Sequence, residues 1–399
     1  MAIKPAHRTE KITYAVRDIV LIADQARAAG KELLYLNIGD PNIYDFRTPD
    51  HLIEATAEAM RQNHNGYSHS SGIEEARDAI RRDALGKGVK AIRDIFVTTG
   101  ASEAIEIALS ALVDQGDNVL VPAPGYPLYT ALLAKLEAEQ RSYLLDEDHG
   151  WQPDLADIEA RIDSRTRALV LINPNNPTGS VCDRETLLGV LDLCRRHNLV
   201  LFSDEIYDRL LFHGQQHLPS ASLTDDVCVL TFSGLSKNFV APGFRIGWCI
   251  VSGPEEHCRD YLDAMLKLTR ARLSANHPAQ YAIAPALDGD KSHLENIIQI
   301  LERRADLTDR VLNQIPGIRC VRPGAAFYAF PSLDIRSDDE SFVKALIRET
   351  GVVVVHGGGF GQKPGTRHFR LVTLPDDRIL ERAYQRIGDF LADWTRAEA

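Results

Sequence analysis

A single lysine, Lys237, stands in a run of small and apolar residues, "TFSGLSKNFVAPGFRIGW" (231–248). A lysine removed from water has a lowered pKa, so more of it is the neutral amine that attacks carbonyl carbon. Arg245 follows in the same run. Its charge could lower that pKa further, or it could grip a phosphate with two guanidinium nitrogens. A lysine in such a loop can also be structural or a plain phosphate contact, so the pair alone leaves both interpretations open.

A second group of residues could hold an anion. Gly100, Ala101 and Ser102 occupy the turn between a predicted strand and a predicted helix in "VTTGASEAIEIAL" (97–109). Free backbone N–H groups at a helix start, together with the helix dipole, attract negative charge. The same three residues also suit a simple helix N-cap.

Three further polar residues follow predicted strands. Asn176 lies in "LINPNNPTGS" (171–180), and Asp204 and Tyr207 lie in "LFSDEIYDRL" (201–210). A carboxylate placed where a strand leaves the core requires a cation or a strong donor. Tyr207 could lie beside it on one helical turn. A rigid turn at Asn176 and a salt-bridged loop acid at Asp204 are the alternatives.

One cofactor would use this whole set. Pyridoxal 5′-phosphate has a phosphate, a ring nitrogen that must stay protonated, a phenolic oxygen and an aldehyde. An aspartate pairs with the ring N–H, a lysine binds the aldehyde, and other donors hold the phosphate. In open α/β sheets such ligands gather at the carboxyl ends of the strands. The set therefore predicts a pyridoxal-phosphate site.

The elements that must position these residues alternate along the chain. Short, continuously apolar runs predict buried strands, and helical patterns lie between many of them. The predicted strands are 94–98, 118–122, 168–173, 199–205, 227–232 and 245–251, and the clearest intervening helices are 101–113, 126–138 and 184–197. This alternation favours an α/β domain with a mostly parallel sheet covered by helices.

The rest of the chain suits a smaller α+β domain. Residues 255–315 read as helix, and short strands and a closing helix at 376–393 follow. We expect an N-terminal arm that begins the small domain (1–49), a large cofactor-binding domain (50–290) and a small C-terminal domain (291–399).

Composition and charge exclude several classes of function. The 399 residues carry a formal net charge of −11, which repels nucleic acid and anionic membranes. The six cysteines form no C-x-x-C pair and the histidines show no ligand spacing, so no metal site is expected. The N-terminus is too polar for a signal peptide and no run is long enough to span a membrane, which predicts a soluble cytoplasmic protein.

Motifs spread over nearly the whole chain resemble those of the fold-type-I, class I/II aminotransferases, in the order typical of that family. They are "GYSHSSGIEEAR" (66–77), "TTGASEA" (98–104), "APGYPLY" (123–129), "NPNNPTG" (173–179), "SDEIYD" (203–208), "SGLSKNFVAPGFRIGW" (233–248), "PGAAFYAFP" (323–331) and "HFRLVTLP" (368–375). The resemblance implies an aspartate aminotransferase-like fold. Its large domain would hold a mostly parallel seven-stranded sheet between helices, with a smaller α+β domain beside it.

The resemblance also implies roles around the cofactor. Lys237 would bind the aldehyde and move the substrate's Cα proton, and Asp204 would pair with the pyridinium nitrogen. Tyr207 and Asn176 would donate to the phenolic oxygen, and Tyr126 would stack on the ring. The expected phosphate-binding residues are Gly100, Ala101, Ser102, Ser233, Ser236 and Arg245.

Further roles concern the substrate and a second subunit. Arg370 in "HFRLVTLP" resembles the clamp for the substrate α-carboxylate, aided by Asn176 and the backbone at Gly39. Tyr67 resembles the tyrosine that reaches the neighbouring subunit's phosphate, which implies a homodimer. The reaction would be a ping-pong exchange between an amino acid and a 2-oxo acid.

The N-terminal stretch 14–46 resembles the alanine (glutamate–pyruvate) branch of the family. This favours L-alanine and 2-oxoglutarate as substrates, giving pyruvate and L-glutamate. Arg17 is a candidate contact for the side-chain carboxylate of glutamate or 2-oxoglutarate, and an arm salt bridge is the alternative. "HGGGFG" (356–361) has no lysine in P-loop spacing, so it suggests a substrate-site loop and not a nucleotide loop.

Several alternatives stay open at this point. The same fold carries aminotransferases for valine, aromatic amino acids or methionine, and C–S lyases that use the same cofactor. The effector domain of a transcription regulator is another alternative, but such proteins carry a basic DNA-binding domain ahead of these motifs. This chain is acidic and has only about 35 residues before "LNIGDP".

Overall fold

An eight-stranded sheet lies at the centre of the larger part of the molecule. This computed structural model describes residues 3–12 and 15–398, and the side chains of residues 3–12 and 19–398. In spatial order the strands are β2 (Ile92–Thr98), β9 (Gly247–Ser252), β8 (Val229–Gly234), β7 (Val200–Asp204), β6 (Thr166–Ile172), β3 (Asn118–Ala123), β4 (Glu139–Asp146) and β5 (Gln152–Pro153).

Most neighbouring strands of this sheet are parallel. The five strands from β8 to β4 pair in parallel, whereas β9 is antiparallel to both of its neighbours. The mostly parallel sheet predicted from the sequence is confirmed. The resemblance implied seven strands, whereas the sheet has eight, and the smallest is β5, a two-residue strand antiparallel to the end of β4.

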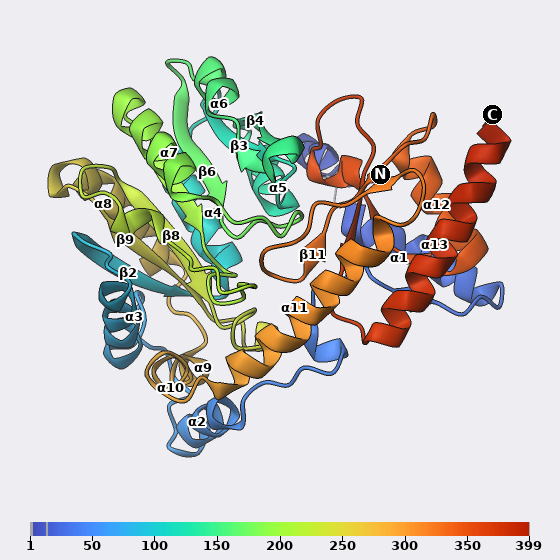
Figure 1. Cartoon of the computed structure of the whole chain (residues 1–399). Helices are drawn as coiled ribbons and strands as arrows, with labels where there is room; N and C mark the ends of the chain where they lie inside the picture. The colour runs from blue at the N-terminus through green and yellow to red at the C-terminus, as the bar shows by residue number, and fades with distance from the viewer. Residues whose placement is uncertain (1–2, 13–14, 399) are drawn as a thin grey trace.

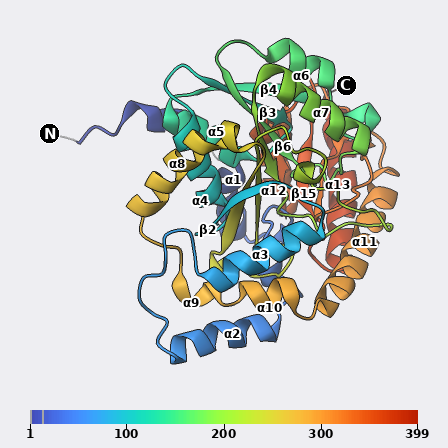
Figure 2. The same cartoon turned by 90° about the vertical axis from the view of Figure 1, so that its left-hand side faces the viewer.

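Helices cover both faces of the sheet, as Figure 1 shows. One apolar cluster joins α4 (Ala101–Leu112), α5 (Pro127–Leu136) and α8 (Glu255–Ala271) to one face. The other cluster joins to the opposite face α3 (Glu74–Gly86), α6 (Leu155–Arg161), α7 (Arg184–His197) and α10 (Ile283–Asp288). The continuously apolar strand sequences follow from this burial on two sides. In Figure 2, α2 (Asp50–Arg61) and α9 (His277–Gln280) lie beside α10 at one end.

A third apolar cluster forms the core of the smaller part. Its helices are α1 (Ala15–Ala28), α11 (Ser292–Leu312), α12 (Asp339–Thr350) and α13 (Asp377–Glu398). Its strands are β1 (Leu34–Tyr35), β10 (Ile318–Arg319), β11 (Tyr328–Ala329), β12 (Ser332–Leu333), β13 (Val352–Val353), β14 (Val355–His356) and β15 (Phe369–Val372). Short 3-10 helices in the described residues are η1 (His7–Lys11), η2 (Pro41–Ile43), η3 (Glu147–His149), η4 (Ser220–Ser222), η5 (Pro242–Phe244) and η6 (Gly357–Phe360).

Two features connect the two parts of the chain. Strand β1 pairs in parallel with β13, so the N-terminal segment lies with the C-terminal elements. Helix α11 runs from beside α10 to the side of the molecule that holds α12 and α13 (Figure 1). The domain boundary near residue 290 stays a prediction.

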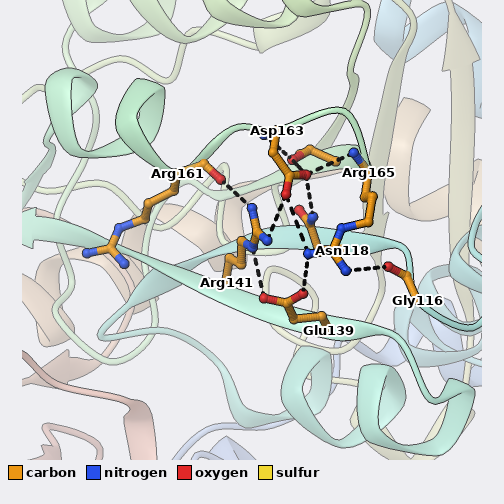
Figure 3. A network of polar contacts seen from close by, with 8 residues as sticks. Gly116, Asn118, Glu139, Arg141, Arg161, Asp163 and Arg165 are labelled. Atoms are coloured by element: carbon orange, nitrogen blue, oxygen red, sulfur yellow. Dashed lines mark hydrogen bonds and ion pairs between the residues drawn. The ribbon is translucent and has the colours of Figure 1, made fainter.

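A polar network fixes the edge of the sheet where β3, β4 and β6 begin (Figure 3). Asp163 accepts a hydrogen bond of 2.9 Å from Asn118 Nδ2 and lies 2.8 Å from Arg141 Nη2. Glu139 lies between Arg141 and Arg165. The backbone N–H of Arg165 and the side chain of Asn118 hold the pKa of Asp163 well below its usual value. This network lies at the strand ends opposite the polar residues singled out above, and it helps to set the strand register.

No helix among the described residues is long and apolar enough to cross a membrane.

Candidate active site

A cavity of about 690 Å³ opens at the carboxyl ends of the central strands. This is where ligands bind in open α/β sheets. It brings together most of the residues predicted from the sequence. The predicted residues that line it are Gly39, Ala101, Ser102, Tyr126, Asn176, Asp204, Tyr207, Ser236, Lys237, Arg245 and Arg370.

Lys237 reaches this cavity from the loop that follows β8. Its Nζ donates a hydrogen bond of 2.8 Å to the carbonyl oxygen of Gly39 and lies 5.6 Å from the centre of the Phe327 ring. Burial lowers the pKa of Lys237 to about 8; the charge of Asp40 opposes this shift and that of Arg370 adds to it. Because the usual value is near 10.5, this amine is far more often neutral at physiological pH than a surface lysine.

Asp204 lies at the bottom of the cavity, where β7 ends. Its carboxylate is 4% exposed and accepts hydrogen bonds from Tyr129 Oη at 3.2 Å and from the backbone N–H of Ile206 at 3.4 Å. Burial raises the pKa of Asp204 to about 6 despite these donors. Within the described part of the chain, no cationic side chain lies in ion-pair contact with Asp204. The cavity therefore presents a buried acid suited to a cationic N–H group on a ligand.

Tyr207 stands near Asp204 on the short segment that follows β7. Its hydroxyl is 3.0 Å from the hydroxyl of Tyr328, and its ring packs edge-on against the rings of Phe327 and Tyr328. Burial raises the pKa of Tyr207 well above its usual value, so the side chain remains a hydroxyl donor at neutral pH.

Arg370 closes the side of the cavity formed by the smaller part. This guanidinium is 3% exposed and donates to Asn176 Oδ1 at 3.3 Å and to the carbonyl oxygen of Asn37. It lies over the rings of Tyr328 and Phe360, at 4.9 and 4.7 Å from their centres. The two ring faces and the two oxygen atoms hold the planar guanidinium of Arg370 in one orientation. A guanidinium held in this way can donate two parallel hydrogen bonds to a carboxylate.

The opposite end of the cavity lies at the first turn of α4. Gly100 has a φ of 76° and precedes this helix, and a Cβ atom there would lie 2.5 Å from Arg245 Nη2. A Cβ at Gly247 would lie 2.2 Å from the backbone nitrogen of Ala101. The chain therefore needs glycine at both positions to bring the guanidinium of Arg245 beside the helix start. A positive side chain next to free N–H groups forms a cradle for an anion.

Three predicted residues do not line this cavity, and the side chain of a fourth is not described. Gly100 supports the cradle without lining the cavity. Ser233 lines a separate small cavity with Lys87 and Asp208 and is not among the residues that line the larger cavity, and its assignment to the phosphate stays a prediction. Tyr67 is 82% exposed and does not line the cavity of its own chain. The side chain of Arg17 lies outside the described residues.

Some residues of the site were not predicted from the sequence. Tyr129, the donor to Asp204, stands three residues after Tyr126 in "APGYPLY", a spacing that places both on one side of a helix. Asp40 and Tyr328 also line the cavity. Both belong to segments that resemble those of the family, but no separate role was predicted for either residue. Val20, Leu21 and Ile38 form its apolar edge, and nothing in their local sequence signals a ligand.

Known proteins resemble this chain along almost its whole length. It is 41% identical to the alanine aminotransferase of Mycobacterium tuberculosis (strain ATCC 25618 / H37Rv), covering 97% of this chain and 92% of that protein. It is 38% identical to the glutamate-pyruvate aminotransferase AlaA of Escherichia coli (strain K12), with 98% of both chains covered.

Solved structures agree with these matches. The alanine aminotransferase of Pyrococcus furiosus superposes with a TM-score of 0.94 at 38% identity, covering 98% of this chain and all of that one. The aspartate aminotransferase-like fold is confirmed by an aspartate aminotransferase of Thermus thermophilus, which superposes with a TM-score of 0.88 at 29% identity. A profile of the family described as "Aminotransferase class I and II" matches residues 31–387. The chain belongs to the class I and II aminotransferases.

Proposed function

We propose that this aminotransferase uses pyridoxal 5′-phosphate to exchange the amino group between L-alanine and 2-oxoglutarate, forming pyruvate and L-glutamate. The observation that carries the proposal is the convergence of Lys237, Asp204 and Arg370 on one cavity. The names of the M. tuberculosis and E. coli relatives support these substrates.

The donor set of the cavity fits this cofactor. Asp204 offers a buried acid to the protonated ring nitrogen, and burial keeps Tyr207 a hydroxyl donor for the phenolic oxygen, aided by Asn176. Tyr126, which also lines the cavity, would stack on the face of the ring. The groups available for the phosphate are the backbone of Ala101, the hydroxyls of Ser102 and Ser236, and the guanidinium of Arg245. When bound, the cofactor would withdraw electrons from the bonds at the substrate's Cα.

Lys237 would both hold the cofactor and move the proton. Its amine, with a pKa of about 8, is available in the neutral form that accepts the substrate's Cα proton. The same amine would then deliver the proton two bonds from Cα, to the carbon on the other side of the substrate nitrogen. These reaction steps run forward with the amino acid and in reverse with the 2-oxo acid. The two substrates therefore bind in turn, in a ping-pong order.

Arg370 would bind the α-carboxylate that every substrate of this reaction carries. Its side chain is already held by Asn176, Asn37 and two aromatic rings, so little conformational freedom is lost when a carboxylate binds. The carbonyl oxygen of Gly39 lies next to the amine of Lys237, which brings the backbone of this segment close to the reacting atoms.

The apolar edge made by Val20, Leu21 and Ile38 supports a small, uncharged donor side chain such as that of alanine. Arg17 on α1 stays our candidate for the second carboxylate of 2-oxoglutarate. Its place on the same helix as Val20 and Leu21 supports this choice.

We also propose that the active unit is a homodimer in which Tyr67 reaches the partner's phosphate cradle. The exposure of this aromatic ring in the single chain supports the assignment, because a large side chain left in water often marks an interface. Tyr67→Phe should weaken cofactor binding in a dimer. A fully active monomer would contradict this part of the proposal.

The substrate proposal is tested with purified protein, added cofactor and a panel of amino donors, each with 2-oxoglutarate. We expect L-alanine to give the highest kcat/KM, ahead of valine, methionine and the aromatic amino acids. If another amino acid is preferred, the proposed substrate is wrong, but the reaction is still a transamination. Release of ammonia and pyruvate from cysteine conjugates, without any 2-oxo acid, would instead identify a C–S lyase.

A further inference from the structure

Two cysteines far from the candidate active site are in direct contact. Cys228 immediately precedes β8, and Cys258 lies in the first turns of α8. Their sulfur atoms are 3.3 Å apart, and the two residues are 7% and 1% exposed. No other pair of cysteines in the described chain is in hydrogen-bond contact through sulfur. Because the sulfurs of a disulfide are about 2.05 Å apart, these two atoms would have to approach by roughly one further ångström to be joined.

A route from solvent reaches Cys228, and Cys258 lies directly behind it, with the two sulfur atoms in contact. Cys228 lines a second cavity, of about 640 Å³, which lies where the strands begin and so at the opposite end of the sheet from the candidate active site. The lone Cys194 and the basic residues Arg195 and His257 line the same cavity. A small, uncharged oxidant can enter a space of this size, whereas the bulk of the core excludes it.

The surroundings favour proton loss from Cys258. The hydrogen bond that Cys258 shares with Cys228 lowers the pKa of the Cys258 thiol, burial opposes this effect, and the positive charge of Arg93 adds to it. The first turn of α8 also presents the positive end of the helix dipole. The hydrogen bond with Cys258 and burial raise the pKa of Cys228. The pair therefore combines one thiol suited to form a thiolate with a neighbouring thiol in reach of it, an arrangement typical of peroxide-reactive cysteines.

We propose that Cys228 and Cys258 form an oxidation site for peroxides. The Cys258 thiolate attacks one peroxide oxygen, the O–O bond breaks, and the leaving hydroxide takes up the proton that the thiol released, giving one water and a sulfenic acid on Cys258. The sulfur of Cys228 then attacks the sulfenic sulfur, its proton leaves with the hydroxyl group as a second water, and the S–S bond forms. Overall, two thiols are oxidised by two electrons and one hydrogen peroxide is reduced to two waters.

The bridge would enclose the segment that carries Lys237 and Arg245, because Cys228 and Cys258 stand 30 positions apart on either side of it. It would connect the start of β8 with the first turns of α8. The proposal is independent of the substrate assignment, because neither cysteine lines the candidate active site.

The test uses the reduced, folded holoenzyme and hydrogen peroxide in slight molar excess, followed by unfolding and thiol titration. We expect the chain to lose two of its six thiols and the mass of two hydrogen atoms. Peptide mapping should find Cys228 linked to Cys258. Retention of all six thiols, or a link between any other two cysteines, would overturn the proposal.

Two variants and one matched control sharpen the test. In Cys228→Ser the sulfenic acid on Cys258 has no partner, so we expect addition of oxygen atoms in place of the loss of hydrogen. In Cys258→Ser no two-thiol loss should occur. Cys194→Ser removes a buried thiol from the same cavity and should react as the wild type does. Two-thiol loss that persists in Cys258→Ser, or that disappears in Cys194→Ser, contradicts the assignment.

Discussion

The guanidinium of Arg304 holds the carboxylate of Asp45 with two nitrogen atoms, at 2.6 and 3.1 Å. Arg304 lies on α11 and is 2% exposed. It also donates to the carbonyl oxygen of Leu374, just beyond the strand that carries Arg370. One buried side chain thus links the segment that follows Gly39 to the segment that follows β15, the strand of the proposed carboxylate clamp Arg370.

The first prediction concerns this tie. Arg304→Met should raise KM for both substrates about tenfold, because loosening either segment misplaces groups that bind the substrate carboxylate. Because the Asp45 side chain is about half exposed and keeps its contact with water when Arg304 is removed, the free energy of unfolding should fall by only about 1 kcal/mol, mainly from the lost hydrogen bond to Leu374. Steady-state kinetics and urea unfolding measure the two effects. Arg303→Met is the matched control, because Arg303 stands beside Arg304 on the same helix but is exposed. An unchanged KM in Arg304→Met would show that the tie has no role in substrate binding.

The anion cradle gives a second prediction. Gly100→Ala places a Cβ atom 2.5 Å from Arg245 Nη2, so the guanidinium must move away from the start of α4. We expect the dissociation constant of pyridoxal 5′-phosphate to rise at least about tenfold. Gly116→Ala is the control, because Gly116 also has a positive φ but no atom within 4 Å of the added Cβ. Equal cofactor affinity in the two variants would indicate that Arg245 does not bind the phosphate.

Asp204→Asn should affect stability and activity in opposite directions. Burial raises the folded-state pKa of Asp204 to about 6, above its usual 3.8. Its contribution to the stability of the cofactor-free protein is therefore fully present below about pH 4 and is lost as the pH rises through about 6. Asparagine carries no charge that must be removed from water. The variant should therefore be more stable than the wild type at pH 7, by about 2 kcal/mol.

The same variant lacks the negative charge proposed for the ring nitrogen, so kcat should fall about a thousandfold. Thermal unfolding of the cofactor-free proteins between pH 4 and pH 7 measures the stability difference, which should grow with pH. Asp192→Asn, at an exposed site on α7, should change neither quantity. A cofactor-free Asp204→Asn protein less stable than the wild type at pH 7 would contradict the explanation.

The sequence predicted the site residues that belong to recognisable motifs. Lys237, Asp204 and Arg370 come from segments far apart in the chain, and the order of their motifs was enough to place them in one cavity. Ser233 lines a different cavity, which residue order could not predict, because strand side chains alternate between the two faces of a sheet.

Contacts that depend on tertiary packing were not predicted. Neither the donor Tyr129 nor the buried Arg304 shows its role in the local sequence, because each role depends on a residue from another element. Strand β4, "EQRSYLLD", was missed because its polar residues hide the strand pattern.

The helix expected over 255–315 is interrupted where Asn276 caps α9 and where Gly289 ends α10. Asn276 with Pro278 is a helix-start signal that the sequence did contain.

The most direct measurement locates the covalent attachment of the cofactor. The holoenzyme is reduced with borohydride and digested, and the peptide that carries the pyridoxyl group is identified by mass spectrometry. We predict that this group is on Lys237, and that Lys237→Ala loses both the label and the absorbance band near about 420 nm. Lys344→Ala, at a partly exposed position on α12, should keep both. Attachment to another lysine, or persistence of the band in Lys237→Ala, would contradict the account.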